Sequence, residues 1–315
     1  MSPEELERRL RAVGAERYHD KHPFHLRMHE GRLAPEEIRL WVRNRYYYQT
    51  RIPVKDGLIL AKSEDAAFRR EWVGRIHDHD GRAPGEGGLE LWLALADAVG
   101  LDRRRVEDLS GVLPGVRAAC DDYVRLVESN DLLASVASSL TELFAGDIMR
   151  TRIEAFERHY PWVDTAGLRY FRSRTVQAPK DARFGLAFVL ANATSPDDQA
   201  RCIAALERKC EILWRLLDAV EAAGRKPRLS PHAALRTDAP DGGRPDDAAL
   251  VVLPERAVRL NASGAEILAL CDGARSAASI AETLRDRHPD VAHVEPDVHA
   301  FLEQMERLGV LESLR

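Results

Sequence analysis

Paired cysteines, long apolar runs and an excess of basic charge are all missing from this 315-residue chain. Its four cysteines show neither a CxxC pair nor the spacing of metal ligands, so we expect reduced, buried thiols. No run approaches the roughly 18 apolar residues of a membrane-spanning helix, and the N-terminus lacks a secretory signal pattern. The net charge of −5 argues against nucleic-acid binding. The sequence predicts a cytoplasmic protein that binds no membrane and no nucleic acid.

Helical periodicity dominates the chain up to about residue 222, and no alternating strand pattern interrupts it. Ser2 and Pro3 begin a capping box, while Pro35 and Pro196 precede acidic residues at two further helix starts. The helices expected from this periodicity lie near 36–50, 64–79, 87–99, 115–128, 131–157, 165–177, 181–193 and 196–221. The pattern predicts an all-α bundle over residues 1–223.

The composition changes at Gly224 to a segment rich in proline, glycine and aspartate. This change predicts a linker and an irregular first strand over residues 224–248. Two short apolar runs, Ala249–Leu253 and Ala257–Leu260, predict a hairpin. Helix starts are expected at Ser263, Ser276 and Pro296. Residues 249–315 are therefore expected to form a small α+β domain of winged-helix type.

Several charged residues of the helical part lie on faces that should point inward. Arg45 and Gln49 share a helical stripe with Trp41, and Arg75 and His79 share one with Trp72. The inward cations are Arg45, Arg75, Arg152, Arg174 and Lys209. Glu142 is the one inward carboxylate that this periodicity identifies, so it does not balance them. A ligand with several carboxylates or phosphates would do so, with Gln49, Tyr123 and Tyr170 adding neutral hydrogen bonds.

Other chemistries remain open at this point. The run His77–Asp80 resembles a metal-binding signature, but neighbouring residues of a helix point about 100° apart, so the four side chains do not face one ion. The Glu-x-x-His pairs of a di-iron bundle are not found. Cys120 beside Asp121 leaves a thiaminase-like nucleophile as an alternative, although no histidine stands at a suitable spacing.

The helical part resembles the pyrroloquinoline quinone (PQQ) synthase family, PqqC, over essentially all of residues 5–222. The segments that carry the resemblance are Arg17–His25, Asn44–Asp56, Arg75–Gly81, Leu113–Arg117, Ser138–Ala145, His159–Trp162, Tyr170–Arg174 and Lys209–Trp214. The resemblance implies a haem-oxygenase-like fold, a homodimer, and neither metal nor organic cofactor. It also implies a reaction in which molecular oxygen oxidises a bicyclic tricarboxylate precursor, whose third ring closes, to PQQ with release of hydrogen peroxide.

The same resemblance assigns roles residue by residue. The catalytic positions that it implies are His79, Tyr170, Arg174 and Glu142. The substrate-binding positions are Tyr18, His19, Arg45, Gln49, Lys55, Arg75, Tyr123, Met149, Arg152 and Lys209. His79 matches the position that moves protons near the reacting ring, which suits the near-neutral pKa of imidazole. A non-catalytic PQQ carrier is the alternative that keeps the same pocket.

Met149 departs from the family pattern, which has a histidine at this position on the oxygen side of the pocket. A methionine fills the space, but it neither shuttles a proton nor donates a hydrogen bond. The hypothesis is that the late oxidative steps are slower in this chain, or that another group such as Tyr170 substitutes.

The C-terminal part resembles PqqD, the peptide-binding protein of the same pathway. The resemblance rests on Leu253–Glu255, Val258–Asn261, Ile267–Gly273 and Asp297–Leu302. It implies binding of the precursor peptide PqqA as an added strand, together with the radical enzyme PqqE. From Arg228 onward ten arginines face fifteen acidic residues, a net charge of −5, which is the wrong sign for a DNA-binding winged helix.

Overall fold

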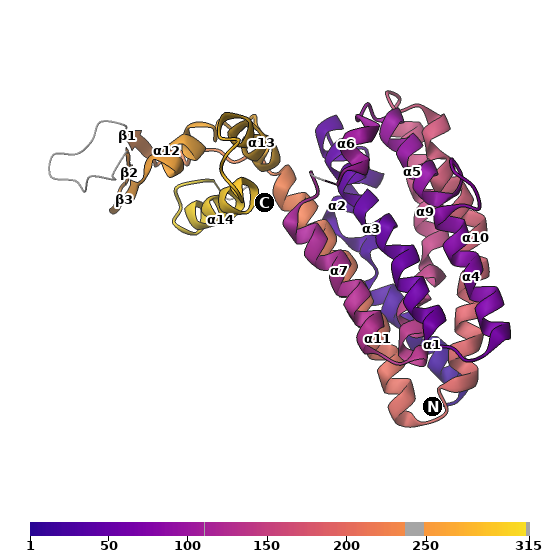
Figure 1. The fold of residues 1–315 in the computed structure, drawn as a ribbon. Helices are drawn as coiled ribbons and strands as arrows, with labels where there is room; N and C mark the ends of the chain where they lie inside the picture. Colours follow the sequence, from indigo (N-terminus) through magenta and orange to yellow (C-terminus); the bar gives the residue numbers. More distant parts are fainter. Residues whose placement is uncertain (110, 237–248, 313–315) are drawn as a thin grey trace. The chain divides into compact units, whose positions relative to one another are not determined.

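A computed structural model describes residues 1–109, 111–236 and 249–312 of the chain. The chain divides into two compact units, Met1–Val220 and Glu221–Arg315. The described part of the first unit contains only helices, while the second combines a small sheet with three helices (Figure 1). The predicted fold class is confirmed for both parts.

The first unit is a bundle in which long helices lie side by side (Figure 1). Its α-helices are α1 (Pro3–Arg17), α2 (Pro23–His29), α3 (Pro35–Ala61), α4 (Ala66–Asp80), α5 (Gly87–Ala98), α6 (Arg103–Glu107), α7 (Pro114–Ser129), α8 (Leu132–Ser138), α9 (Glu142–His159), α10 (Arg169–Asn192) and α11 (Pro196–Gly224). Single 3₁₀ turns are η1 (His19–Lys21), η2 (Ser139–Thr141) and η3 (Thr165–Leu168). Helix α3 packs against α4, α5 and α7, and α10 packs against α9.

Two helices continue through an internal proline. Helix α3 runs past Pro53 to Ala61, and α10 runs past Pro179 to Asn192. The predicted end near residue 50 and the predicted break between 177 and 181 are therefore wrong. A proline costs a helix about 3 kcal/mol through its missing N–H and its steric clash. Burial of the flanking turns, which include Ile52, Ala178 and Ala182, offsets that cost.

One predicted helix is divided in the structure. The stretch expected as a single helix over 131–157 consists of α8 and α9, separated by the turn η2. By length and composition Leu132–His159 meets the criteria of a membrane span, contrary to the expectation from the sequence. However, 67% of its most apolar window is buried inside the protein, as in the core helix of a globular domain.

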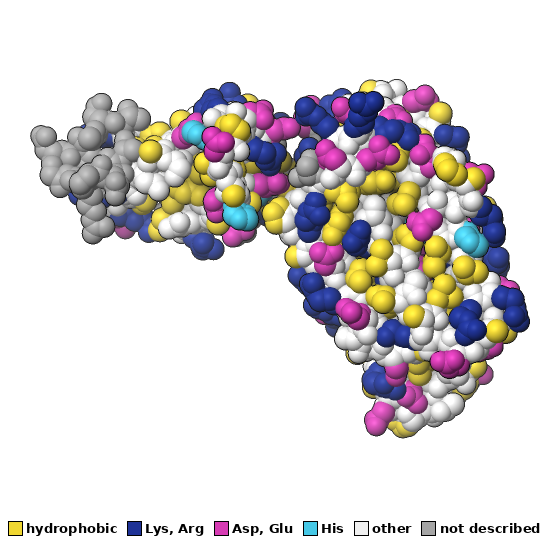
Figure 2. Space-filling view, viewed as in Figure 1, with side chains coloured by type: hydrophobic (Ala, Val, Ile, Leu, Met, Phe, Trp, Pro, Cys, Tyr) yellow, Lys and Arg dark blue, Asp and Glu magenta, His cyan; other side chains and the backbone are white. Residues whose placement is uncertain are grey.

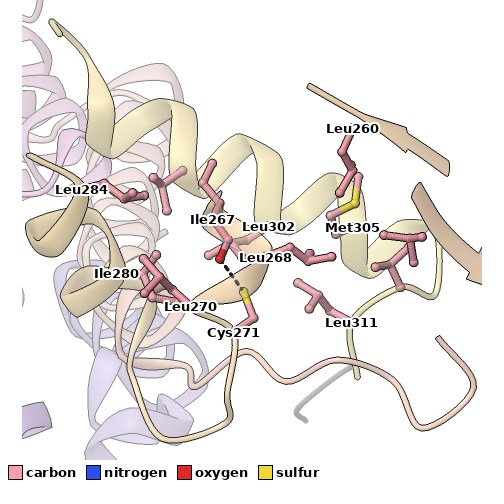
Figure 3. Packing of buried hydrophobic residues seen from close by; sticks show 14 of the residues in the cluster. Leu260, Ile267, Leu268, Leu270, Cys271, Ile280, Leu284, Leu302, Met305 and Leu311 are labelled. Atoms are coloured by element: carbon pink, nitrogen blue, oxygen red, sulfur yellow. Dashed lines mark hydrogen bonds between the residues drawn. The ribbon is translucent and has the colours of Figure 1, made fainter. Parts of the chain in front are cut away.

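The second unit packs three helices against an antiparallel sheet. Its elements are β1 (Ala234–Arg236), β2 (Ala249–Leu253), β3 (Arg256–Leu260), α12 (Ala262–Ala269), α13 (Ala277–Arg287) and α14 (Val294–Arg307). The strand order is β1-β2-β3, and the predicted hairpin of β2 and β3 pairs Val251 with Val258. Leucine, isoleucine and methionine side chains from the helices and the sheet form its core (Figure 3).

The start of the second unit differs from the sequence-based expectation in two details. The N-cap of α12 is Asn261, which accepts from the backbone N–H of Gly264, and not Ser263. Residues 225–230 were expected in a linker, but Arg228 and Leu229 form β-bridges with Asp272 and Leu311. Strand β1 lies in the predicted irregular strand region. The part of that region over 237–248 lies outside the described residues.

Candidate functional site

Asp56 holds two buried cations on neighbouring helices of the first unit. Its Oδ1 lies 2.6 Å from Lys55 Nζ and 3.4 Å from Arg75 Nε, and it accepts from the Trp72 indole at 3.0 Å. Lys55 Nζ also donates to Ser139 Oγ at 2.9 Å. Burial lowers the pKa of Lys55 to about 8, although Asp56 opposes the shift. The carboxylate therefore offsets much of the cost of burying both cations.

Two more carboxylates complete this network. Glu142 lies 2.7 Å from Arg174 and 3.4 Å from Arg75, and Asp181 lies 3.3 Å from both arginines. Burial opposes ionisation of Glu142, but Arg174 and Arg75 lower its pKa to about 2. The inference from sequence that Glu142 alone faces the cations is wrong, because Asp56 and Asp181 share that role. We call Lys55, Asp56, Arg75, Glu142, Arg174 and Asp181 the paired network.

Arg45 and Lys209 both contact Tyr48, and neither forms an ion pair with a carboxylate among the described residues. The Lys209 Nζ donates to the Tyr48 hydroxyl at 2.8 Å and lies 3.4 Å from the centroid of the Tyr123 ring. The Arg45 Cζ lies 3.6 Å from the centroid of the Tyr48 ring, and its buried Nη1 has no partner among the described residues. Burial, assisted by the charge of Arg45, lowers the pKa of Lys209 well below its usual value.

Arg152 is the third cation without a carboxylate. Its Nη1 lies 3.7 Å from Met149 Sδ, and its Nη2 lies 3.3 Å from His25 Nε2. Burial and the charge of Arg45 lower the pKa of Arg152 to about 9. Within the described part of the chain, none of the ion pairs includes Arg45, Arg152 or Lys209. We call these three residues the unpaired cluster.

These buried charges differ from those on the surface. Figure 2 shows lysine and arginine interspersed with aspartate and glutamate over the visible face of the first unit. Such exposed charges contribute little to stability because water screens them. By contrast, Arg152 is 2% exposed and Lys209 is 0% exposed. Arg45, the third member, is half-buried. Water therefore has little access to two of the three residues of the unpaired cluster.

His79 presents a nitrogen ready to accept a proton. Its Nδ1 lies 3.1 Å from the backbone oxygen of Arg75, which only accepts, so the imidazole proton is on Nδ1. The Nε2 is buried and has no partner among the described residues. Burial and the charge of Arg174 lower the pKa of His79 to about 4, so the ring is neutral near pH 7. The Nε2 lone pair of a neutral His79 is therefore available to accept a hydrogen bond.

The remaining predicted residues lie in the same interior. The Tyr170 hydroxyl donates to Gln49 Oε1 at 2.9 Å. Tyr18 and His19 meet edge to face with ring centroids 4.4 Å apart, and both are buried. Burial and the charges of Arg45, Arg152 and Lys209 lower the pKa of His19 well below its usual value. The structure thus brings together residues from η1, α3, α9, α10 and α11.

A cavity of about 420 Å³ opens on the α4 and α10 side of the unit. Of the predicted site residues, Arg75 lines it in the part of the chain that the structure describes. Asp181, Gln177 and Lys180 of α10 form its other wall. The paired network therefore borders this cavity, whereas the unpaired cluster lies away from its lining.

Four residues of the candidate site were not predicted from the sequence, namely Asp56, Asp181, Tyr48 and His25. Asp56 and Asp181 continue the stripes of Arg45 and Arg174, eleven and seven residues later. Helical periodicity finds both carboxylates once the helices are extended through the two prolines. Tyr48 and His25 lie within segments that carry the family resemblance. Their residue types alone gave no reason to assign either of them to the site.

The described residues, 1–109, 111–236 and 249–312, include histidine, cysteine and carboxylate side chains. No group of three or more histidine, cysteine, aspartate or glutamate side chains there is arranged to hold a metal ion. His77 and Asp78 line the cavity, while His79 is buried with Nδ1 on the Arg75 carbonyl. The reaction without cofactor stays a prediction.

Comparison with curated proteins identifies the helical unit. The chain is 47% identical over 233 residues to the pyrroloquinoline-quinone synthase of Gluconobacter oxydans (strain 621H), covering 74% of this chain and 98% of that protein. It is 50% identical over 224 residues to the pyrroloquinoline-quinone synthase of Pseudomonas entomophila (strain L48), covering 71% and 88% respectively. The matched length corresponds to the first unit rather than to the whole chain.

Solved structures share the fold of the helical unit, and family models match both parts of the chain. A haem-oxygenase-like domain of unknown function from Shewanella denitrificans OS217 superimposes with a TM-score of 0.58 at 15% identity, covering 70% of this chain and 92% of that one. A TenA homologue from Pseudomonas syringae pv. tomato gives a TM-score of 0.55 at 15% identity, covering 69% and 91%. Residues 249–311 match the family described as coenzyme PQQ synthesis protein D. Residues 7–219 match the TENA/THI-4/PQQC family, and the chain therefore belongs to that family.

Proposed function

We propose that this chain is a pyrroloquinoline-quinone synthase that uses molecular oxygen as electron acceptor. The observation that carries the proposal is the unpaired cluster, Arg45, Arg152 and Lys209, inside a domain about 47% identical to proteins of that name. Buried cations without carboxylates require an anionic partner. A substrate with three carboxylates supplies that charge, because each carboxylate accepts charge-assisted hydrogen bonds from an arginine or lysine.

The paired network plays a different part in the reaction. Its cations already have partners, so we assign to it the geometry around His79. The substrate-binding roles that the resemblance implies for Lys55 and Arg75 stay predictions. His79 Nε2 takes the proton that leaves the reacting ring, while Tyr170 and Gln49 orient the substrate. Each two-electron oxidation of the substrate reduces one O₂, and two protons complete one H₂O₂.

Rapid mixing with the ring-open precursor tests the proposal. Metal-stripped protein is mixed with precursor without oxygen, and air is then admitted. We expect quinone absorbance and hydrogen peroxide to appear only after oxygen enters, at a rate unchanged by the chelator. A chain that binds PQQ but consumes no oxygen when the ring-open precursor is supplied would be a carrier instead.

A thiaminase-like hydrolase finds no support in the site. Cys120 is buried, and burial raises the pKa of its thiol to about 12. The nucleophilic form of cysteine is the thiolate, so a thiol of this pKa is unreactive near neutral pH. A Cys120→Ala variant that retains oxygen consumption separates this alternative from the oxidase.

The proposal extends to the second unit, which matches the PqqD family over residues 249–311. Strand β3 lies at an edge of the sheet order, and a peptide can add to a sheet as a further strand at such an edge. Binding of the precursor peptide PqqA to the full chain, measured by fluorescence anisotropy, tests this part. The radical enzyme PqqE as a partner, the homodimer and the cytoplasmic location stay predictions from the resemblance.

A further inference from the structure

His25 is a buried histidine beside the unpaired cluster that the proposed reaction does not use. It lies on α2 and is 1% exposed. Its Nε2 lies 3.3 Å from Arg152 Nη2. Its Nδ1 lies 2.9 Å from the backbone oxygen of His19 and 3.2 Å from His19 Nδ1. One imidazole therefore contacts two residues that are expected to bind the substrate.

These contacts fix the protons of both rings when the rings are neutral. A guanidinium group only donates, so His25 Nε2 is an acceptor without a proton. The proton of His25 is then on Nδ1, where the carbonyl of His19 accepts it. The His19 Nδ1, which faces the same N–H, carries no proton of its own, and His19 is left with its proton on Nε2.

Both rings have a physical reason to be neutral. Burial and the charge of Arg152 lower the pKa of His25 well below its usual value. Burial, with the charges of Arg45, Arg152 and Lys209, does the same to the pKa of His19. Protonating either ring would add a further positive charge to a region that already lacks carboxylates.

We propose that His25 is a positioning residue that fixes His19 as its Nε2–H tautomer and holds the Arg152 guanidinium in place. The inference rests on the proposed function, since two donors are then directed at a carboxylate-bearing substrate before it arrives. Preorganised donors avoid the cost of reorientation during the reaction. Without His25, the imidazole of His19 samples both tautomers, and one of them presents a lone pair to the substrate.

Histidine ¹⁵N NMR of the resting protein tests the tautomers directly, without any reaction. We expect ¹⁵N shifts of a protonated Nε2 for His19 and of a protonated Nδ1 for His25. A wild-type spectrum with His19 protonated on Nδ1, or as imidazolium, overturns the proposal even if no variant folds. The tautomers can be measured even if the chain does not oxidise the precursor. A failure of the proposed function is therefore distinguished from a failure of this inference.

Substitutions then separate the two contacts. His25→Leu removes both, and we expect averaged tautomers at His19 and a loss of at least tenfold in kcat/KM. His25→Asn keeps a donor near the Nδ1 position, so the His19 tautomer is retained while the Arg152 contact is lost. His29→Phe is the matched control, because His29 stacks on His25 at 5.9 Å and its Nε2 has no partner among the described residues. An unchanged His19 signal and kcat/KM in His25→Leu contradict the proposal.

Discussion

The paired network and the unpaired cluster are built from the same kinds of residue but balance their charge differently. In the paired network three carboxylates face Lys55, Arg75 and Arg174, and the carboxyl–cation distances lie between 2.6 and 3.4 Å. In the unpaired cluster Arg45 and Lys209 contact tyrosine rings, and Arg152 contacts an imidazole and a thioether. In the first arrangement carboxylates of the protein balance the cations, whereas the ion pairs of the described residues include no carboxylate partner for the second.

The presence or absence of carboxylate partners distinguishes the paired network from the unpaired cluster more clearly than burial does. Arg75 and Arg152 are 5% and 2% exposed, so burial alone does not distinguish them. Their pKa values shift in opposite directions, because carboxylates raise that of Arg75 whereas burial and Arg45 lower that of Arg152. The two groups should therefore respond in opposite ways to substitution.

The largest effect is expected for Asp56→Asn in the paired network. This variant leaves Lys55 and Arg75 buried without their shared carboxylate, and we expect the free energy of unfolding to fall by about 3–5 kcal/mol. Urea denaturation measures the change. Asp122→Asn, which removes ion pairs of the exposed Arg125 and Arg215, should cost less than about 1 kcal/mol. Equal losses of unfolding free energy in the two variants would show that the buried ion pairs contribute no more than the exposed ones.

Arg45→Met should show the opposite pattern. Removing a cation from the unpaired cluster relieves repulsion with Arg152, so we expect stability to be unchanged or higher. PQQ affinity should fall about 10- to 100-fold, the equivalent of one charged hydrogen bond. Calorimetric titration with PQQ measures the affinity. The control in the paired network is Arg174→Met, which should lower both PQQ affinity and stability. If Arg45→Met lowers stability as much as Arg174→Met does, the unpaired cluster is compensated within the protein.

Stability should fall as the pH falls from about 6.5 to 4. The folded-state pKa values of His79 and His29 are about 4, below the unfolded value of about 6.5, so the unfolded state binds more protons in this window. Each such histidine contributes a slope of about 1.4 kcal/mol per pH unit. Urea denaturation at several pH values should show a shallower slope for His79→Gln. An unchanged slope would show that His79 is charged or exposed; substitution of the exposed His232 serves as the control.

The smallest effect is expected for Met149→His. Met149 lies against Arg152 in the unpaired cluster, where a thioether is a weak acceptor. A histidine there would supply a proton carrier, so we expect severalfold faster turnover and less build-up of intermediates, measured by stopped-flow absorbance. Met149→Leu should match the wild type. If the histidine variant also matches it, the late oxidative steps are not slowed by methionine.

Periodicity in the sequence predicted correctly which cationic side chains are buried. It predicted that Arg75, Arg152, Arg174 and Lys209 point inward, and all four are buried. Arg45 was predicted on the same grounds and is half-buried. What failed was the treatment of proline as the end of a helix, which hid Asp56 beyond Pro53 and Asp181 beyond Pro179.

By itself, the sequence determined the helical class of the first part, the change to a mixed second part, and which cations face inward. These features follow from local periodicity and composition, which act over a few residues. Only the tertiary structure decided which cations are paired. An ion pair depends on distances of a few ångströms between helices far apart in the chain, such as α4 and α10, and periodicity along one helix carries no information about that separation.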